Sequence, residues 1–116
     1  MRSNVERSDI RSIISFLEGN IAENKKRELS RKLLKLIDVP TRKRRSASIY
    51  KINKFTKDNE SVIVPGKVLS EGAMDHKVSI AALSYSKKAK EELKRSGARL
   101  ARIEELINEK GVRIIV

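Results

Sequence analysis

The sequence contains no cysteine and no tryptophan, and it has only two phenylalanines and two tyrosines. Without cysteine the chain has no disulfide framework, no thiolate metal site and no cysteine nucleophile, which is compatible with a reducing cytoplasm. Because aromatic rings are so few, we expect an aliphatic core. His76 is the single histidine, so a zinc site lacks a second nitrogen or sulfur ligand, and Asp75 beside it is not enough. One histidine without an organised nucleophile also makes no catalytic triad.

Long apolar runs are absent as well. No segment approaches the roughly 18–20 apolar residues that cross a bilayer. The first 19 residues carry charges every few positions, unlike the apolar region of a signal peptide. We therefore expect no membrane partner, and a chain that stays in the compartment where it is made.

Signatures of catalysis are also missing. No glycine-rich phosphate loop of the Walker or dinucleotide-binding type is present. The adjacent carboxylates of Glu91-Glu92 and Glu104-Glu105 point in different directions on a helix, so they form solvated faces rather than acid/base pairs. We expect no catalytic residue, no bound metal, no cofactor and no small-molecule substrate.

Positive charge is abundant. The 116 residues include 27 Lys or Arg against 15 Asp or Glu, a formal net charge of +12. A polyanionic partner would relieve this self-repulsion, with nucleic acid as the leading candidate and an acidic membrane surface as the lesser one. Residues 1–57 hold 16 of these cations against 6 acids, whereas residues 58–116 hold 11 against 9. The surface that faces a polyanion should therefore lie mainly on the first half.

Two helices are predicted in the first forty residues. Residues 8–20 carry Ile10, Ile13, Ile14 and Leu17 at helical spacing, and residues 25–38 repeat the pattern with leucines. Proline disfavours helix in the residue before it, so Pro40 ends the second helix. That helix also has a basic face, made of Lys26, Arg27, Arg31, Lys32 and Lys35. The face is either simply solvated or a contact for phosphates.

Strands and helices alternate in the rest of the chain. Residues 62–64 and 78–83 are apolar, β-prone runs that read as buried strands, and we call the segment from 62 to 86 the central stretch. Pro65 should stop the first strand, and Gly66 and Gly72 permit turns. Further strands are expected at 47–52, 99–101 and 112–116, with a turn at Asp58-Asn59. Helices are expected at 87–96, between a Ser86 cap and Gly97, and at 103–110.

This alternation predicts an α/β fold. We expect a small, mostly parallel strand-helix domain over residues 41–116, with a basic helical extension over residues 1–40.

The strongest basic cluster is Arg42, Lys43, Arg44 and Arg45. Four consecutive cations will not pack in a core. The arginine fork fits pairs of phosphate oxygens, and each neutralised phosphate releases counterions. The alternative is a merely solvated or nuclear-localisation-like run.

Two smaller basic groups are also candidates for nucleic-acid contact. Lys51 and Lys54 lie around Tyr50 and Phe55, where an exposed ring could stack on a base, although we expect one ring to pack in the core. Lys67, His76 and Lys77 lie in or beside the loop of the central stretch; the alternative is a solvent-facing turn.

The central stretch resembles a known family. The resemblance covers residues 51–116 well, and the first forty residues loosely. It rests on Lys67-Val68-Leu69-Ser70-Glu71-Gly72-Ala73-Met74-Asp75-His76-Lys77-Val78, on Ala81-Ala82-Leu83-Ser84-Tyr85-Ser86-Lys87-Lys88-Ala89, and on Gly97. These residues look like the domain shared by archaeal and eukaryotic large-subunit ribosomal protein eighteen and bacterial protein fifteen. Residues 64–69 and 111–115 look most like the archaeal form. Ser70, Ala98 and Arg102 depart from the family pattern.

The resemblance implies a structural, rRNA-binding role in the cytoplasmic ribosome, with large-subunit rRNA and neighbouring ribosomal proteins as partners. It also implies an irregular β-β-α superhelix and an RNA-backbone contact at Lys67, His76 and Lys77. Composition alone leaves open a stand-alone nucleic-acid-binding module, or a basic enzyme acting on RNA.

Overall fold

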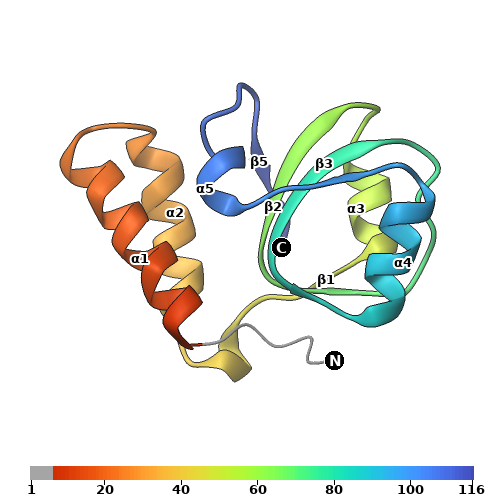
Figure 1. Cartoon of the computed structure of the whole chain (residues 1–116), viewed down its shortest axis with the longest axis horizontal. Coiled ribbons are helices and arrows are strands. Elements are labelled where there is room, and N and C mark those ends of the chain that lie inside the picture. Colours follow the sequence, from red (N-terminus) through yellow and green to blue (C-terminus); the bar gives the residue numbers. More distant parts are fainter. Residues whose placement is uncertain (1–6) are drawn as a thin grey trace.

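A helical hairpin packs against one side of an α/β body (Figure 1). The computed structural model describes residues 7–116, without the side chains of residues 7–9 and 41, so residues 1–6 of the expected extension lie outside the described residues. The hairpin consists of α1 (Arg7–Ala22) and α2 (Arg27–Ile37), as predicted. Asn24 and Lys26 take left-handed backbone angles in the turn between them, with φ of 59° and 46°. Asn20 Nδ2 donates to Ser30 Oγ across the helix pair (3.4 Å).

The body winds short helices around a parallel sheet. In chain order it contains η1 (Thr41–Lys43), β1 (Ala47–Ser48), α3 (Ile49–Phe55), β2 (Glu60–Leu69), β3 (Val78–Tyr85), α4 (Lys87–Arg95), β4 (Arg99–Leu100), α5 (Ile103–Leu106) and β5 (Arg113–Ile114). The strand order is β1-β2-β3-β4, and β5 pairs with β2. Every strand pair within residues 7–116 is parallel, which confirms the predicted α/β class.

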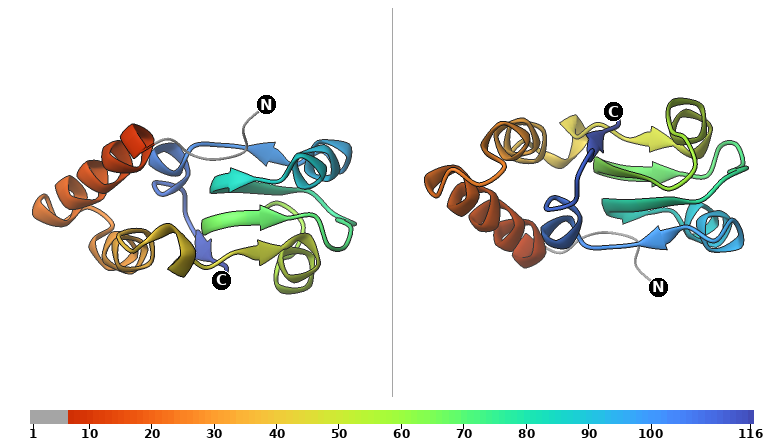
Figure 2. Two further views of the ribbon diagram at one scale, coloured as in Figure 1. Left: turned by 90° about the horizontal axis from the view of Figure 1, so that it is seen from below. Right: turned by 90° about the horizontal axis from the view of Figure 1, so that it is seen from above.

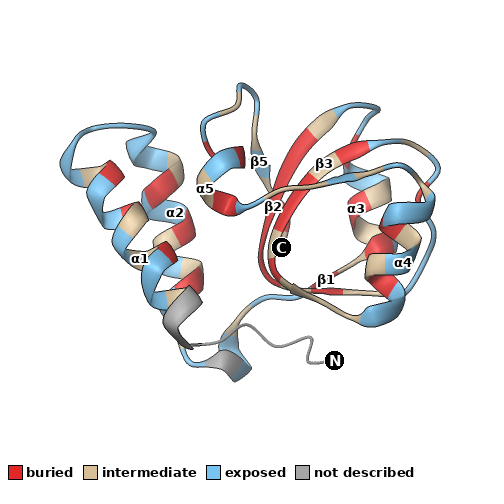
Figure 3. Ribbon diagram, in the orientation of Figure 1, coloured by how far each residue is buried: buried red, intermediate tan, exposed pale blue. Residues whose placement is uncertain are grey.

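The central strands bury both faces. Side chains alternate across a strand, so Val62 and Val64 of β2 face one core, and Ile63 faces another. The first core includes Ile49 and Ile52 of α3 and residues of α4. The second includes residues of α1, α2 and α5. The buried residues therefore follow the strands and the inward sides of the helices (Figure 3).

The prediction that Pro65 stops the first strand was wrong. Strand β2 continues to Leu69, because the β2–β3 register shifts between Val64 and Lys67. Such an irregularity accommodates a residue that has no N–H to donate. Gly66 is not at a left-handed turn. Its backbone lies against Arg45, and a Cβ at this position would collide with the carbonyl oxygen of Arg45.

The predicted strand at residues 47–52 is only partly present. It ends at Ser48, whose Oγ accepts the N–H of Lys51 at 3.2 Å and caps α3. Serine is a favoured helix cap, and this local bond overrides the weak strand pattern of the following residues. The predicted turn is confirmed, since Asn59 has a φ of 65° and its N–H donates to Lys77 O.

The later elements agree with the sequence patterns, although some are shorter. Ser86 Oγ accepts the N–H of Ala89 at 3.1 Å, and Gly97 has a φ of 83° after α4. The last helix covers only Ile103–Leu106, and the last strand only Arg113–Ile114.

We predict that Gly66→Ala lowers the free energy of unfolding by roughly 1–3 kcal/mol, because backbone atoms must move to admit the new methyl group. Urea unfolding followed by circular dichroism would measure the change. Gly19→Ala is the control: Gly19 is helical and has open space around it. Alanine there should stabilise α1 by about 0.5–1 kcal/mol. An unchanged midpoint for Gly66→Ala would contradict the close approach of Arg45.

Candidate nucleic-acid interface

The outer face of α2 is cationic. Its five predicted contact residues are all exposed: Lys26, Arg27, Arg31, Lys32 and Lys35. Leu33 and Ile37 face the core. The helix therefore separates a packed apolar side from a solvated basic side, as its sequence predicts.

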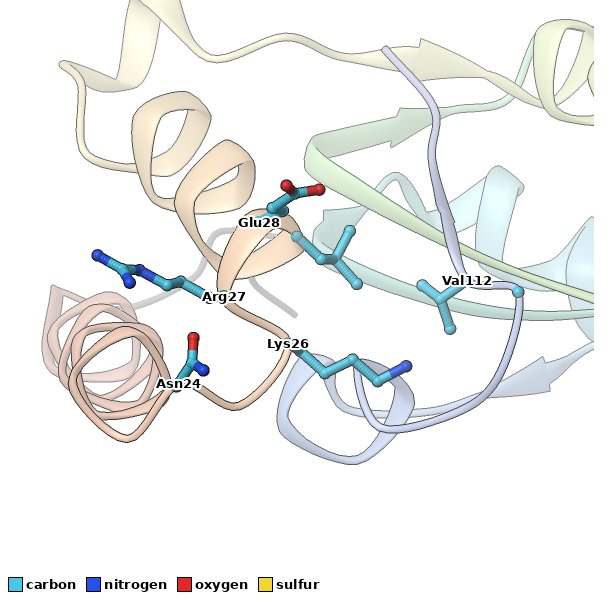
Figure 4. Close-up of a pocket in the computed structure, with 7 residues that line it drawn as sticks. Asn24, Lys26, Arg27, Glu28 and Val112 are labelled. Carbon is cyan, nitrogen blue, oxygen red and sulfur yellow. The ribbon is translucent and has the colours of Figure 1, made fainter.

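A groove lies where the hairpin meets the body (Figure 4). It has a volume of about 410 Å³, and its lining includes Asn24, Lys26, Arg27, Glu28 and Val112. Figure 4 shows the Lys26 side chain extending toward the segment with Val112, whereas Arg27 points away. Lys26 Nζ donates to the carbonyl oxygen of Glu109 at 3.3 Å. Lys26 thus ties the hairpin to the body, and Arg27 stays on the outer face.

The cluster at residues 42–45 divides into outward and inward members. Arg42, Lys43 and Arg45 are exposed, whereas Arg44 is half-buried. Arg44 Nε donates to the carbonyl oxygen of Ile37 at 3.0 Å, at the end of α2. A cation is favourable at a helix C-terminus, where carbonyl groups lack helical partners. Arg44 therefore fixes the segment, and the other three cations are presented to solvent.

Helix α3 displays two aromatic rings. Tyr50 is 59% exposed and Phe55 is 47% exposed, so the expectation that one of these rings packs in the core was wrong. The core-facing positions of α3 are taken by Ile49 and Ile52. Lys54 Nζ lies 5.6 Å from the centroid of the Phe55 ring.

His76 is held by neighbours rather than turned to solvent. Its side chain is 14% exposed. Nε2 lies 2.7 Å from Thr56 Oγ1, and Nδ1 lies 2.7 Å from Asp75 Oδ1. The bond to His76, followed by one to Asn53, holds the pKa of Asp75 below its usual value. His76 thus joins its loop to the end of α3.

The other two loop cations differ in exposure. Lys77 is exposed and passes beside Gly97, where an added Cβ would lie 3.2 Å from Lys77 Cε. Lys67 is half-buried on β2.

Most of the salt bridges between described residues lie in the second half of the chain, although Lys25 pairs with Glu23 in the first half. Arg95 pairs with Glu92, Arg99 with Glu109, Arg102 with Glu104, and Arg113 with Glu60. All of these residues belong to the second half. The predicted contact cations of the first half other than Arg44 differ, because within residues 7–116 no salt bridge involves the following: Lys26, Arg27, Arg31, Lys32, Lys35, Arg42, Lys43, Arg45, Lys51 and Lys54.

Two further properties concern the described part of the chain. It contains no group of three or more His, Cys, Asp or Glu side chains placed to hold a metal ion. None of its helices has the length and apolar character needed to span a membrane.

The Glu92–Arg95 pair predicts how the stability of the fold changes at acidic pH. The pKa of Glu92 is lowered from 4.5 to about 2, first by its hydrogen bond to Arg95 and second by the hydrogen bond that it accepts from the N–H of Met74. A carboxyl with a lowered pKa stabilises the fold above its unfolded pKa and loses that effect as pH falls toward its folded pKa. Glu92→Gln should therefore be less stable than the parent near pH 7, and the difference should shrink between pH 4.5 and 2.

Urea unfolding at a series of pH values would measure this difference. Glu91→Gln is the control, because Glu91 is exposed on the same helix and its side chain has no hydrogen bond or salt bridge among the described residues. A Glu92→Gln difference that stays constant down to pH 2 would contradict the assignment.

Comparisons with known proteins agree with the resemblance seen in the sequence. No family model matches the chain. The large ribosomal subunit protein eL18 of Sulfurisphaera tokodaii is 39% identical over 110 residues, covering 91% of this chain and 89% of that protein. The eL18 protein of Sulfolobus acidocaldarius is 47% identical over 73 residues, covering 63% and 62%. That of Methanoregula boonei is 31% identical over 121 residues, covering 99% of each. The chain therefore belongs to the family of archaeal large ribosomal subunit protein eL18.

Proposed function

We propose that this protein is a structural constituent of the large ribosomal subunit, located in the cytoplasm, that binds and bridges large-subunit rRNA. One observation supports this most: each of the four arginines of the second half pairs with a carboxylate, while within residues 7–116 no salt bridge involves the exposed cations of α2, of residues 42–45 or of α3. Unpaired, solvated lysine and arginine side chains are free to replace the counterions of RNA phosphates. The names of the relatives support the ribosomal setting.

The positions of the cations support bridging. Figure 2 shows the α1–α2 hairpin at one end of the strands, and α3 with α4 at the other. The protein measures 38 Å along its longest axis. The basic face of α2 and the lysines of α3 therefore point to separate surroundings, and residues 42–45 connect them. In this proposal the protein holds phosphates of different RNA segments that would otherwise repel each other.

Recognition would depend mainly on the RNA backbone. Phosphate contacts fix position without reading sequence, and the deep, narrow major groove of an RNA helix hides base edges from side chains. The proposed contacts are the cations of α2, residues 42–45, α3 and the loop of the central stretch. His76, held by Thr56 and Asp75, would act mainly by positioning that loop. Neighbouring ribosomal proteins would contact the parts of the surface that rRNA does not cover. No catalysis is proposed.

We predict that Arg42→Gln, Lys43→Gln and Arg45→Gln together weaken binding to large-subunit rRNA at low salt. They should also reduce the slope of log K against log salt by about 2–3, because each lost phosphate contact removes roughly 0.7–0.9 from the slope. Filter binding across a range of KCl concentrations would measure both quantities.

A charge-matched control separates position from net charge. Lys87→Gln, Lys88→Gln and Lys94→Gln remove the same three charges from exposed sites on α4. This control should change the slope less than the 42–45 variant. Equal effects would mean that overall charge alone drives binding. Absence of the protein from washed large subunits in sedimentation would contradict the ribosomal role and favour a stand-alone module.

A further inference from the structure

Helix α3 carries an unusual set of exposed side chains. Tyr50 and Phe55 are the exposed large hydrophobic residues of the described chain, and they account for two of its four aromatic rings. A single exposed apolar side chain is ordinary in a soluble protein. Here both rings lie on one helix of 7 residues, together with Lys51 and Lys54 and without any acidic residue. Two exposed rings beside two lysines point to a particular ligand more strongly than exposed rings or lysines would alone.

The four side chains follow a definite order around the helix. Successive residues of an α-helix are rotated by about 100°. The exposed arc of α3 therefore runs from Tyr50 through Lys54 and the half-buried Lys51 to Phe55. The opposite arc holds Ile49 and Ile52, which are buried. Two rings thus flank two lysines, and the 5.6 Å distance from Lys54 Nζ to the Phe55 ring places a cation and a ring side by side.

The loop of the central stretch holds α3 at three points. The N–H of Tyr50 donates to the carbonyl oxygen of Glu71 at 2.7 Å. Asn53 Oδ1 accepts the N–H of Asp75 at 3.0 Å. Thr56 Oγ1, just after the helix, lies 2.7 Å from His76 Nε2. The attachments at Asn53 and Thr56 lie away from the arc that carries Lys54 and Phe55. The attachment at Tyr50 uses its backbone N–H, and Tyr50 remains 59% exposed.

Gly72 makes the first of these attachments possible. A Cβ on Gly72 would lie 2.6 Å from the backbone nitrogen of Tyr50, and Gly72 has a φ of 99°, which side chains disfavour. The loop can therefore lie directly against the start of α3. A binding surface that is fixed in advance loses less conformational entropy when its ligand arrives.

We infer that the exposed arc of α3 is a stacking platform for unpaired bases of large-subunit rRNA, with Lys51 and Lys54 holding the adjoining phosphates. Each nucleotide offers an apolar base face and a phosphate, which matches the alternation of rings and lysines. Every base has such a face, so stacking tolerates sequence variation. A lysine pair without a carboxylate also favours a polyanion over a neighbouring protein. This inference rests on the proposed function and adds a contact to bases.

The test compares ring variants with lysine variants of the full chain, using large-subunit rRNA as the probe. Tyr50→Leu with Phe55→Leu should weaken binding on the order of tenfold or more at every salt concentration, since each stacked base contributes about 5- to 100-fold. The salt slope should not change, because the rings neutralise no phosphate. Lys51→Gln with Lys54→Gln should instead reduce the slope by about 1–2. Tyr50→Phe, which keeps the ring, should retain the parental affinity.

Tyrosine fluorescence provides a second readout with a defined probe. The chain has no tryptophan and two tyrosines, so Tyr85→Phe leaves Tyr50 as the only reporter. A single-stranded adenine hexanucleotide should quench its emission, whereas an abasic hexamer of equal charge should not.

The outcomes separate the two proposals. Parental affinity of the leucine variant for rRNA, together with equal responses to the two hexamers, would overturn the stacking platform and leave backbone binding intact. The rings would then be free to cover a neighbouring protein. Failure of the parent protein to bind rRNA at low salt would instead overturn the proposed function itself.

Discussion

The structure depends on one constraint: strands β2 and β3 are apolar on both faces, so both faces must be covered. Parallel strands buried on two sides require elements on each side of the sheet. Helices α3 and α4 contribute to one core, and the hairpin with α5 contributes to the other. The basic face of α2 and the lysines of α3 are consequently carried to different ends of the protein (Figure 2). The packing of the core thus determines where on the surface the lysines and arginines of α2 and α3 lie.

The distribution of charge follows a similar division. In the second half, four arginines bind carboxylates within the protein, and the pKa of Glu109 lies below its usual value, with Arg99 as the first cause. Residues 1–57, in contrast, contain 16 lysines and arginines but only 6 acidic residues. Surface ion pairs add little stability, so the pairing matters mainly because it leaves one half with little uncompensated charge. The other half retains its full attraction for a polyanion.

The sequence predicted what local rules control. Ser86 and Gly97 cap α4 as expected, the strand pairs are parallel, and the family resemblance is confirmed by the relatives. The errors arose from long-range contacts and from competing local ones. The role of Gly66 depends on Arg45, and that of His76 on Thr56, twenty residues away in the chain. The RNA-contacting residues stay predictions, because they depend on a partner as well as on the fold. The division at residue 40 also stays a prediction.

The two glycines of the central stretch connect that fold to the proposed interface. Gly66 lies against the backbone of Arg45, and Gly72 lies against that of Tyr50. In each case the missing Cβ lets a segment from the first half approach the body directly. Arg45 belongs to the basic cluster, and Tyr50 begins the ring-bearing helix. A side chain at either glycine would displace these surface segments as well as strain the local backbone. Strand β2 and the loop that follows it can therefore position a cation and a ring of the proposed interface, because each carries a glycine where the two backbones meet.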